Sequence, residues 1–181
     1  RTHSKDNRSL MQNELEWENR LNAKQIIVHP GSGEIGESIS FLKSLADKRI
    51  IIENMPKIGL NGDILLGHNM KDLIEFQKNG FDLCMDFNHA AKAAASLKIP
   101  IERLVKDMAG ITPKMFHISD GKVDRVVDEH LNLGEGDYDL ALYIRTVLAN
   151  RFNYLTIETP KKSIDDDLKN IQYLQKVIAC A

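Results

Sequence analysis

The chain has 181 residues, of which 43% are hydrophobic and 28% are charged, a composition typical of one globular domain rather than a disordered or fibrous protein. Its apolar runs are too short to span a bilayer and no secretory leader is recognisable, so we expect a cytoplasmic protein with no membrane partner. The formal net charge of −2 does not exclude a polyanionic partner, because two divalent ions bound by carboxylates would change it to about +2.

A helix with imperfect apolar spacing is predicted over residues 9–22, and short β-branched or apolar runs then alternate with helical patterns. We predict strands over 25–28, 49–52, 81–85, 114–118 and 154–157. We predict helices over 37–45, 70–78, 89–97, 101–108, 140–149 and 164–178. Ser163 is a candidate N-cap for the last helix, and the three aspartates of its first turn, residues 165–167, suit the helix dipole better than a metal site.

Strands that alternate with helices predict an α/β fold of parallel strands joined by right-handed crossovers. A closed barrel of this kind has eight strands, and five are recognisable here. We therefore expect a single domain over residues 1–181, a partial (β/α) TIM barrel that lacks its N-terminal strands. The alternative is an open doubly wound sheet, but residues 29–33 (HPGSG) lack the GxGxxG spacing that usually follows its first strand.

Each predicted strand ends in a residue that can bind a metal ion. In chain order these residues are His29, Glu53, Asp86 with His89, His117 and Glu158. The carboxyl ends of parallel strands meet at one face, so the side chains should gather there. A single such residue is more often solvated or hydrogen-bonded, but five strands in succession favour a metal site, because buried carboxylates are costly without a cation.

A further pair, Asp128 and His130, follows the fourth strand, with both side chains on one side of an extended segment. Imidazole and carboxylate together suit zinc or manganese, whereas Cys84 and Cys180 form no CxxC pair and are expected to be reduced thiols. Eight ligands exceed the needs of one ion. Two or three ions are therefore implied, an arrangement suited to phosphoester hydrolysis.

Several other polar residues have less specific interpretations. We expect His3 and His68 to be surface residues, and Asp120 either to orient an imidazole or to form a turn before Gly121. Five basic residues fall in loops on the ligand-bearing face, where they are either solvated or placed to contact phosphates: Lys57, Lys122, Arg125, Lys161 and Lys162.

The chain resembles the endonuclease IV (AP endonuclease family 2) branch of the xylose-isomerase-like barrels in six segments: IIVHPGSG, IIIENMP, LCMDFNHA, FHISDG, DEHLNLGEGD and LTIETP. The resemblance runs from about Leu10 to the C-terminus. It implies an eight-stranded barrel with up to three zinc ions, which cuts double-stranded DNA 5′ to abasic sites through a metal-activated hydroxide and leaves a 3′-hydroxyl.

The resemblance also implies a role for each ligand. His29 would bind the first ion, and Glu53 would bridge the first and second as the catalytic metal ligand. The second ion would be completed by Asp86, His117 and Glu158, and the third would be held by His89, Asp128 and His130.

The family supplies one more histidine to the first ion from a strand upstream of residue 9. We expect this chain to be a fragment of a longer barrel, the alternative being an incomplete barrel covered by a partner chain. His3 is a poor substitute ligand. Two other functions stay open: a one-metal sugar isomerase or epimerase that uses only Glu53, Asp86, His117 and Glu158, and a non-catalytic remnant.

Overall fold

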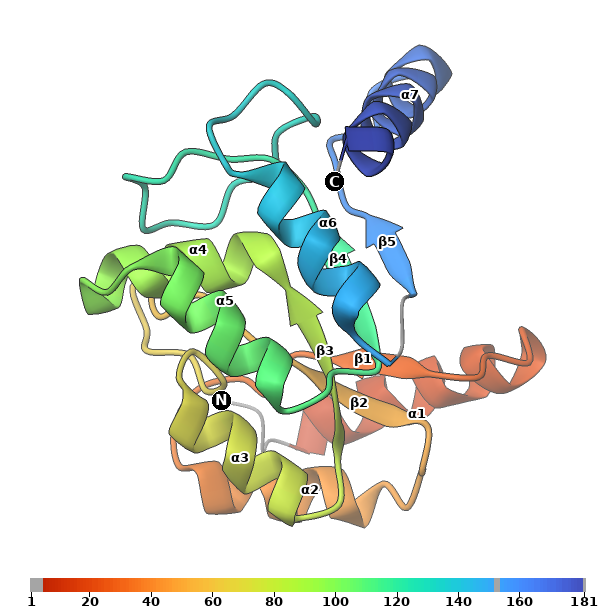
Figure 1. Cartoon of the computed structure of the whole chain (residues 1–181). Coiled ribbons are helices and arrows are strands. Elements are labelled where there is room, and N and C mark those ends of the chain that lie inside the picture. Colours follow the sequence, from red (N-terminus) through yellow and green to blue (C-terminus); the bar gives the residue numbers. More distant parts are fainter. Residues whose placement is uncertain (1–4, 152–153, 181) are drawn as a thin grey trace.

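A computed structural model describes residues 5–151 and 154–180 of the chain. Within that part, five parallel strands form one curved sheet with helices, a half-barrel (Figure 1). The strands are β1 (Ile26–Val28), β2 (Ile50–Glu53), β3 (Asp82–Asp86), β4 (Met115–Ile118) and β5 (Leu155–Ile157). Their spatial order follows the chain from β1 to β5 without the reversal that defines a doubly wound sheet, so the barrel prediction is confirmed.

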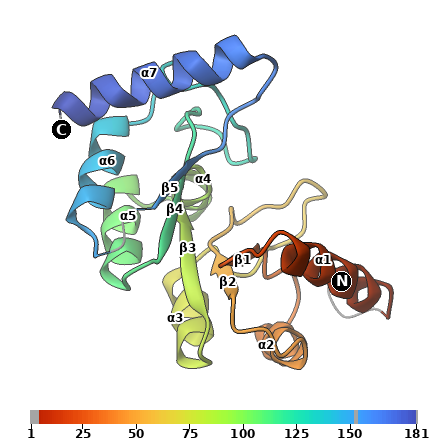
Figure 2. The ribbon, with the colours of Figure 1, turned by 90° about the vertical axis from the view of Figure 1, so that its right-hand side faces the viewer.

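Seven helices accompany these strands in the described residues. They are α1 (Lys5–Arg20), α2 (Ile35–Ser44), α3 (Met70–Lys78), α4 (Phe87–Leu97), α5 (Ile101–Gly110), α6 (Leu140–Ala149) and α7 (Ile164–Cys180). Seen along the sheet, α3, α5 and α6 lie on its outer side, while α1 and α7 lie at its two ends (Figure 2). None of these helices is long and apolar enough to cross a membrane.

The alternation of side chains along each strand separates the core from the ligand-bearing face. Ile50 and Ile52 of β2, and likewise Leu83 and Met85 of β3, belong to the apolar core that packs against the helices. The intervening residues therefore point to the opposite, inner side of the half-barrel. In β4 the same alternation sends Phe116 into the core, where it stacks on Phe87 of α4.

The strand register places the inward-facing residues beside one another on neighbouring strands. His117 is paired with Asp86 across β3 and β4, and Glu53 is paired with Cys84 across β2 and β3. Because the strands are parallel and in chain order, the residues at their carboxyl ends meet at one rim of the half-barrel.

The predicted elements are all present, with shifted ends. Helix α1 spans Lys5–Arg20 rather than 9–22, and it ends before Asn22, which has a left-handed φ of 54°. Helix α4 begins two residues earlier than predicted, because the Asp86 side chain caps it by accepting from the His89 backbone N–H. The N-cap prediction for α7 is confirmed, since Ser163 Oγ accepts from the Asp166 N–H.

Candidate metal centre

Four side chains from neighbouring strands meet at the inner rim, and we call them the quartet: Glu53, Asp86, His117 and Glu158. His117 Nδ1 lies 2.7 Å from Glu53 Oε1 and 3.1 Å from Glu158 Oε1. Asp86 Oδ2 lies 4.0 Å from the same nitrogen. All four ligand atoms lie within 4.8 Å of one another, close enough to surround one ion, with three carboxylates and one imidazole as donors.

The two oxygens of Glu53 face different histidines. Oε1 points to His117 of the quartet, whereas Oε2 lies 2.7 Å from Nε2 of His29, which follows β1. Glu53 is 2% exposed while His29 is 60% exposed, so the carboxylate is fixed and the histidine lies at the solvent edge. Glu53 thus presents one carboxylate oxygen to each of two histidines.

The surroundings of Asp86 indicate whether the quartet suits a cation. Its Oδ1 caps α4, while Oδ2 is fully buried and has no hydrogen-bond partner among the described residues. An unpaired buried carboxylate oxygen is costly unless a cation neutralises it. The donors around it are nitrogen and oxygen atoms of the kind that zinc and manganese accept. The quartet therefore fits a divalent ion.

A second group, which we call the His–Asp–His group, consists of His89, Asp128 and His130. Asp128 Oδ2 lies 3.5 Å from His89 Nε2, and Asp128 Oδ1 lies 3.3 Å from His130 Nε2. The His89 and His130 rings meet edge to face with centroids 6.0 Å apart. The long connection between β4 and α6 thus folds back over the first turns of α4.

Backbone carbonyls orient both histidines of this group. His89 Nδ1 lies 2.9 Å from the Asn54 carbonyl oxygen, and His130 Nδ1 lies 2.7 Å from that of Glu158. A carbonyl can only accept, so Nδ1 carries the proton in each ring and Nε2 is directed at Asp128. Fixing one imidazole nitrogen in this way is how proteins present the other to a metal. The His–Asp–His group is also joined to the quartet, because Asn54 follows Glu53 and Glu158 is a quartet member.

The electrostatics favour histidinium and carboxylate in the chain without a bound ion. Burial opposes charge on His89, but Asp86 and Asp128 outweigh it and raise the pKa of His89 to about 10. A hydrogen bond with Asp128 raises the pKa of His130 to about 9. Burial likewise opposes charge on His117, while its contacts with the Cys84 thiol and the two glutamates raise its pKa to about 12.

The pKa values of the carboxylates shift in two directions. Burial acts to raise the pKa of Glu53, but hydrogen bonds with His117 and His29 lower it to about 2. Glu158 has a lowered pKa because of His117. In Asp86 burial dominates and raises the pKa. The pKa values of these three carboxylates therefore differ, because hydrogen bonds with histidines outweigh burial in Glu53 and Glu158 whereas burial outweighs the nearby histidines in Asp86.

Cys84 also faces the inner rim, where its sulfur is within reach of Glu53 and His117. Sequence spacing gave no reason to place it there, since it forms no CxxC pair; strand alternation, two residues before Asp86, was the available signal. Burial raises the pKa of this thiol to about 12, so without a bound ion it is a neutral thiol beside the quartet.

Two buried asparagines support the centre, and neither was predicted from the sequence. Asn54 Oδ1 accepts from the Asp86 N–H at 2.7 Å and its Nδ2 donates to the Asp86 carbonyl at 2.9 Å, which locks β2 to β3. Asn88 Nδ2 donates to Asp128 Oδ1 at 2.6 Å, while Asn88 Oδ1 accepts from the Tyr138 hydroxyl at 2.8 Å. Each stands directly beside a predicted ligand, in ENMP and FNHA.

Asp120 shapes the loop that carries Asp128 and His130, and it makes no hydrogen bond to an imidazole of the described residues. It is buried, and its carboxylate accepts from the backbone N–H groups of Gly121, Gly134 and Tyr138. A Cβ on Gly136 would lie 2.0 Å from Asp120 Oδ1, so this close approach requires glycine. Of the two interpretations of Asp120, the turn-forming one agrees with these contacts.

The prediction that His68 is a surface residue was wrong. Its side chain is only 13% exposed, and its ring nitrogens contact the Leu65 carbonyl and the Asn69 side chain before α3. His3 lies outside the described residues. Among the basic loop residues, Lys122 Nζ donates to the Glu135 carbonyl, whereas Arg125, Lys161 and Lys162 are exposed.

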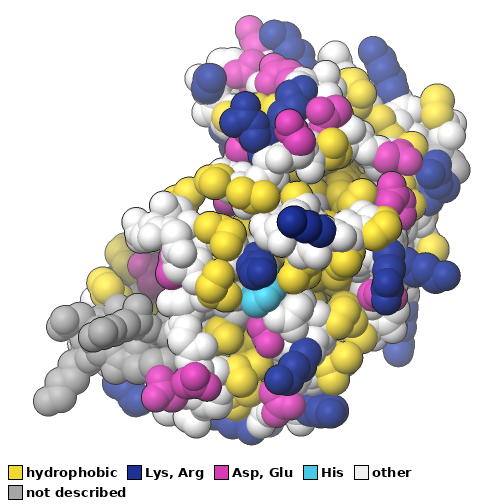
Figure 3. All heavy atoms as spheres, turned by 90° about the vertical axis from the view of Figure 1, so that its left-hand side faces the viewer, with side chains coloured by type: hydrophobic (Ala, Val, Ile, Leu, Met, Phe, Trp, Pro, Cys, Tyr) yellow, Lys and Arg dark blue, Asp and Glu magenta, His cyan; other side chains and the backbone are white. Residues whose placement is uncertain are grey.

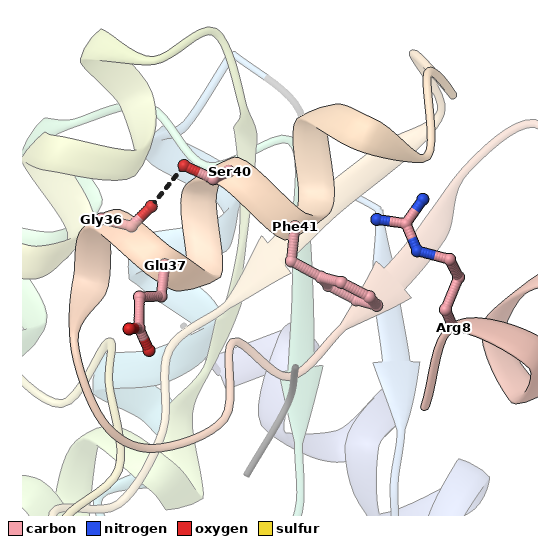
Figure 4. A pocket seen from close by; sticks show the side chains of 5 residues that line it. All are labelled: Arg8, Gly36, Glu37, Ser40 and Phe41. Atoms are coloured by element: carbon pink, nitrogen blue, oxygen red, sulfur yellow. Dashed lines mark hydrogen bonds between the residues drawn. The ribbon is translucent and has the colours of Figure 1, made fainter. Parts of the chain in front are cut away.

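A cavity of about 310 Å³ adjoins the centre, lined by His29 and Asp128 on one side and by a loop that includes Met55, Pro56 and Leu60 on the other. A second cavity, of about 480 Å³, lies between α1 and α2, where Arg8 lies over Phe41 and Ser40 bonds the Gly36 carbonyl (Figure 4). It contains no member of the quartet or the His–Asp–His group. Of these two cavities, the one of about 310 Å³ is lined by candidate ligands.

The sequence profile of the family described as "Xylose isomerase-like TIM barrel" matches residues 1–179. The chain belongs to this family. Its members are usually enzymes and commonly bind divalent metals, in agreement with the ligand groups described above. No protein of curated function matches the sequence.

Solved structures support the xylose isomerase-like fold. A D-tagatose 3-epimerase-like protein has a TM-score of 0.71 and 21% identity, over 93% of this chain and 67% of its own length. Xylose isomerase domain proteins from Alicyclobacillus acidocaldarius subsp. acidocaldarius and Planctomyces limnophilus have TM-scores of 0.61 and 0.62 and identities of 18% and 16%. The match covers 98% and 92% of this chain but 73% and 63% of theirs. At such identities the likeness shows the fold alone.

Proposed function

We propose that this xylose isomerase-like chain carries the zinc centre of a DNA repair endonuclease that cleaves the phosphodiester 5′ to abasic sites. One observation carries the proposal: a second group of ligands, His89, Asp128 and His130, is assembled and oriented beside a quartet that could by itself hold one ion. Hydrolysis of a phosphodiester benefits from several ions, which can act on both the attacking and the leaving oxygen. A proton transfer on a sugar needs one.

The residues have distinct tasks in this proposal. The quartet holds one ion, the His–Asp–His group holds another, and Glu53 with His29 supplies donors between the quartet and solvent. Divalent ions bound there would supply Lewis-acid chemistry, lowering the pKa of water and neutralising the phosphodiester. Asn54 and Asn88 keep Asp86 and Asp128 in place, so that these donors lose little freedom when an ion binds.

The surroundings suit a nucleic-acid backbone in part. Arg125, Lys161 and Lys162 are exposed in the loops after β4 and β5, next to the segment that bears His130 and to Glu158. On one face of the molecule, basic and acidic side chains are interspersed around apolar ones and an exposed histidine (Figure 3). With such a mixed surface, attraction of a polyanion would depend on local basic side chains and bound ions more than on a broad positive field.

The test is cleavage of a duplex with one abasic-site analogue by zinc-loaded protein. We expect a nick 5′ to the lesion whose 3′ end a polymerase extends, and loss of nicking in the Asp128→Asn variant. Asp124→Asn is the matched control, because Asp124 is an exposed aspartate in the same loop. Zinc-loaded protein that leaves the abasic duplex intact would contradict the proposal.

A sugar isomerase or epimerase is the second candidate, favoured by the quartet, which could serve one ion, and by the epimerase-like and isomerase-like names of similar structures. Metal content separates the candidates. One zinc per chain, retained in the Asp128→Asn variant together with aldose–ketose interconversion, would favour the isomerase. Two or more ions, with one lost in that variant, would favour the nuclease.

A further inference from the structure

Lys92 of α4 is completely buried, which is rare for a lysine. Its Nζ donates to Glu129 Oε1 and to the Lys122 carbonyl oxygen, each at 3.0 Å. The ammonium also lies 5.6 Å from the centroid of the Tyr138 ring, within the range of a cation–π contact. All these contacts lie in the loop between β4 and α6, so Lys92 joins α4 to that loop.

Glu129 stands between the two ligands Asp128 and His130. In an extended segment neighbouring side chains point to opposite sides, so Glu129 faces away from the ligands and toward Lys92. Its Oε1 also accepts from the Lys122 backbone N–H at 3.1 Å. Holding Glu129 therefore fixes the rotation of the segment, and with it the direction in which both ligands point.

Helix α4 contacts this segment on both sides. Asn88 and Lys92 are four residues apart and share one helix face. Asn88 donates to Asp128, and Lys92 binds Glu129 one residue further along the loop. His89, on the same first turn as Asn88, is the third member of the His–Asp–His group. One rigid helix thus carries one ligand and two anchors for the other two.

We propose that Lys92 is a positioning residue that creates the second ion site by holding the Asp128–His130 segment over His89. The inference rests on the proposed metal centre and deepens it. Burying a lysine is costly, and a buried ion pair can often be replaced by well-packed apolar side chains without loss of stability. Fold stability alone therefore gives no reason for a lysine here, whereas the alignment of two ligands does.

The experiment is zinc binding by chelator competition, repeated with Co²⁺ and its visible absorption, on the folded protein. The His130→Ala variant identifies the binding step that belongs to the His–Asp–His group. We expect Lys92→Met to weaken that step by about 10–100-fold, as is typical for partners that orient a ligand, and to leave the quartet step unchanged. Lys106→Met, an exposed lysine on α5, is the matched control.

Glu129→Gln provides an independent variant, because Glu129 is 32% exposed and its replacement leaves the core intact. It should weaken the same step, and the double variant should be weaker by less than the product of the two single effects. If zinc binding at the His–Asp–His group is unchanged in Lys92→Met, the role of Lys92 is overturned but the proposed metal centre is not. The same holds if both binding steps weaken equally and Tm falls, because that result indicates a general structural role. Wild-type protein without a second step would overturn the proposed metal centre as well.

Discussion

The affinity of both ligand groups for zinc should rise steeply with pH. Without a bound ion, the pKa values of His117, His89 and His130 are raised to about 12, 10 and 9. All three rings are therefore protonated between pH 6 and pH 8. An ion that binds to a ring nitrogen must displace its proton, so binding becomes more favourable as pH rises toward the raised pKa.

The number of histidines in each group sets how steeply its zinc affinity rises with pH. The quartet contains only His117, so its affinity should increase about tenfold per pH unit, and Asp86, whose pKa burial raises, can only add to this slope. The second group contains His89 and His130, so its affinity should increase about a hundredfold per pH unit. Glu53 has a pKa of about 2 and contributes no proton in this range.

Zinc titrations in metal-buffered solution at pH 6, 7 and 8 measure both slopes, and calorimetry in buffers of different ionisation enthalpy counts the protons released. In the His130→Ala variant the steeper slope should fall from about two to about one, if an ion still binds. Affinities that stay constant between pH 6 and 8, or a slope well below two for the second group, would refute this account of the buried histidines.

Three further changes probe the same residues. Asp86→Asn keeps an N-cap for α4 but removes an anionic ligand, so Tm should change little. The zinc affinity of the quartet should fall by more than the roughly 10–100-fold typical of a residue that only orients a ligand. A large drop in Tm would show instead that the charge of Asp86 supports the fold. Asn54→Ala removes both bonds to the Asp86 backbone and should lower the free energy of unfolding in urea by about 1–3 kcal/mol, whereas no change would mean that the strands hold without it. In metal-free protein, the lowered pKa of Glu53 contributes stability that is lost as pH falls from 4.5 toward 2. The raised pKa values of His89 and His130 contribute stability that is complete below pH 6.5 and is lost as pH rises through 9–10. The urea midpoint should therefore be higher at pH 5.5 than at pH 3 or pH 9, and a higher midpoint at pH 9 would contradict this.

The fold was predictable because hydrophobic periodicity and strand-end chemistry agree. The apolar runs before Glu53 and Asp86 are buried on both sides, which gives a strong strand signal, and parallel topology then places their ends together. Strand boundaries were less certain because these two carboxylates belong to the strands themselves. A polar residue that ends an apolar run looks the same in sequence whether it is the last strand residue or the first of the loop.

The supporting residues were harder to foresee because their roles depend on contacts between distant segments. Lys92 lies in an alanine-rich helix, where a lysine normally points to solvent, and only the fold of the β4–α6 loop buries it. Asn88 and Asp128 are 40 positions apart, and nothing local in either segment specifies their bond. His68 was misplaced for the same reason, since its burial depends on the turn that precedes α3.

The protonation of the centre also changes the charge argument made from composition. With neutral histidines, two divalent ions would change the formal charge from −2 to about +2, a gain of four. Three histidines are protonated before ions bind, so the starting charge is about +1, and displacing their protons leaves the final value at about +2. Loading the centre therefore changes the overall charge by about one unit. If the chain binds DNA as proposed, zinc should scarcely alter its affinity for undamaged duplex, measured by fluorescence anisotropy at pH 7, but should strengthen binding to an abasic duplex, where the exposed phosphodiester can reach the ions. An equal gain for both duplexes would mean that zinc acts through the general field rather than at the centre.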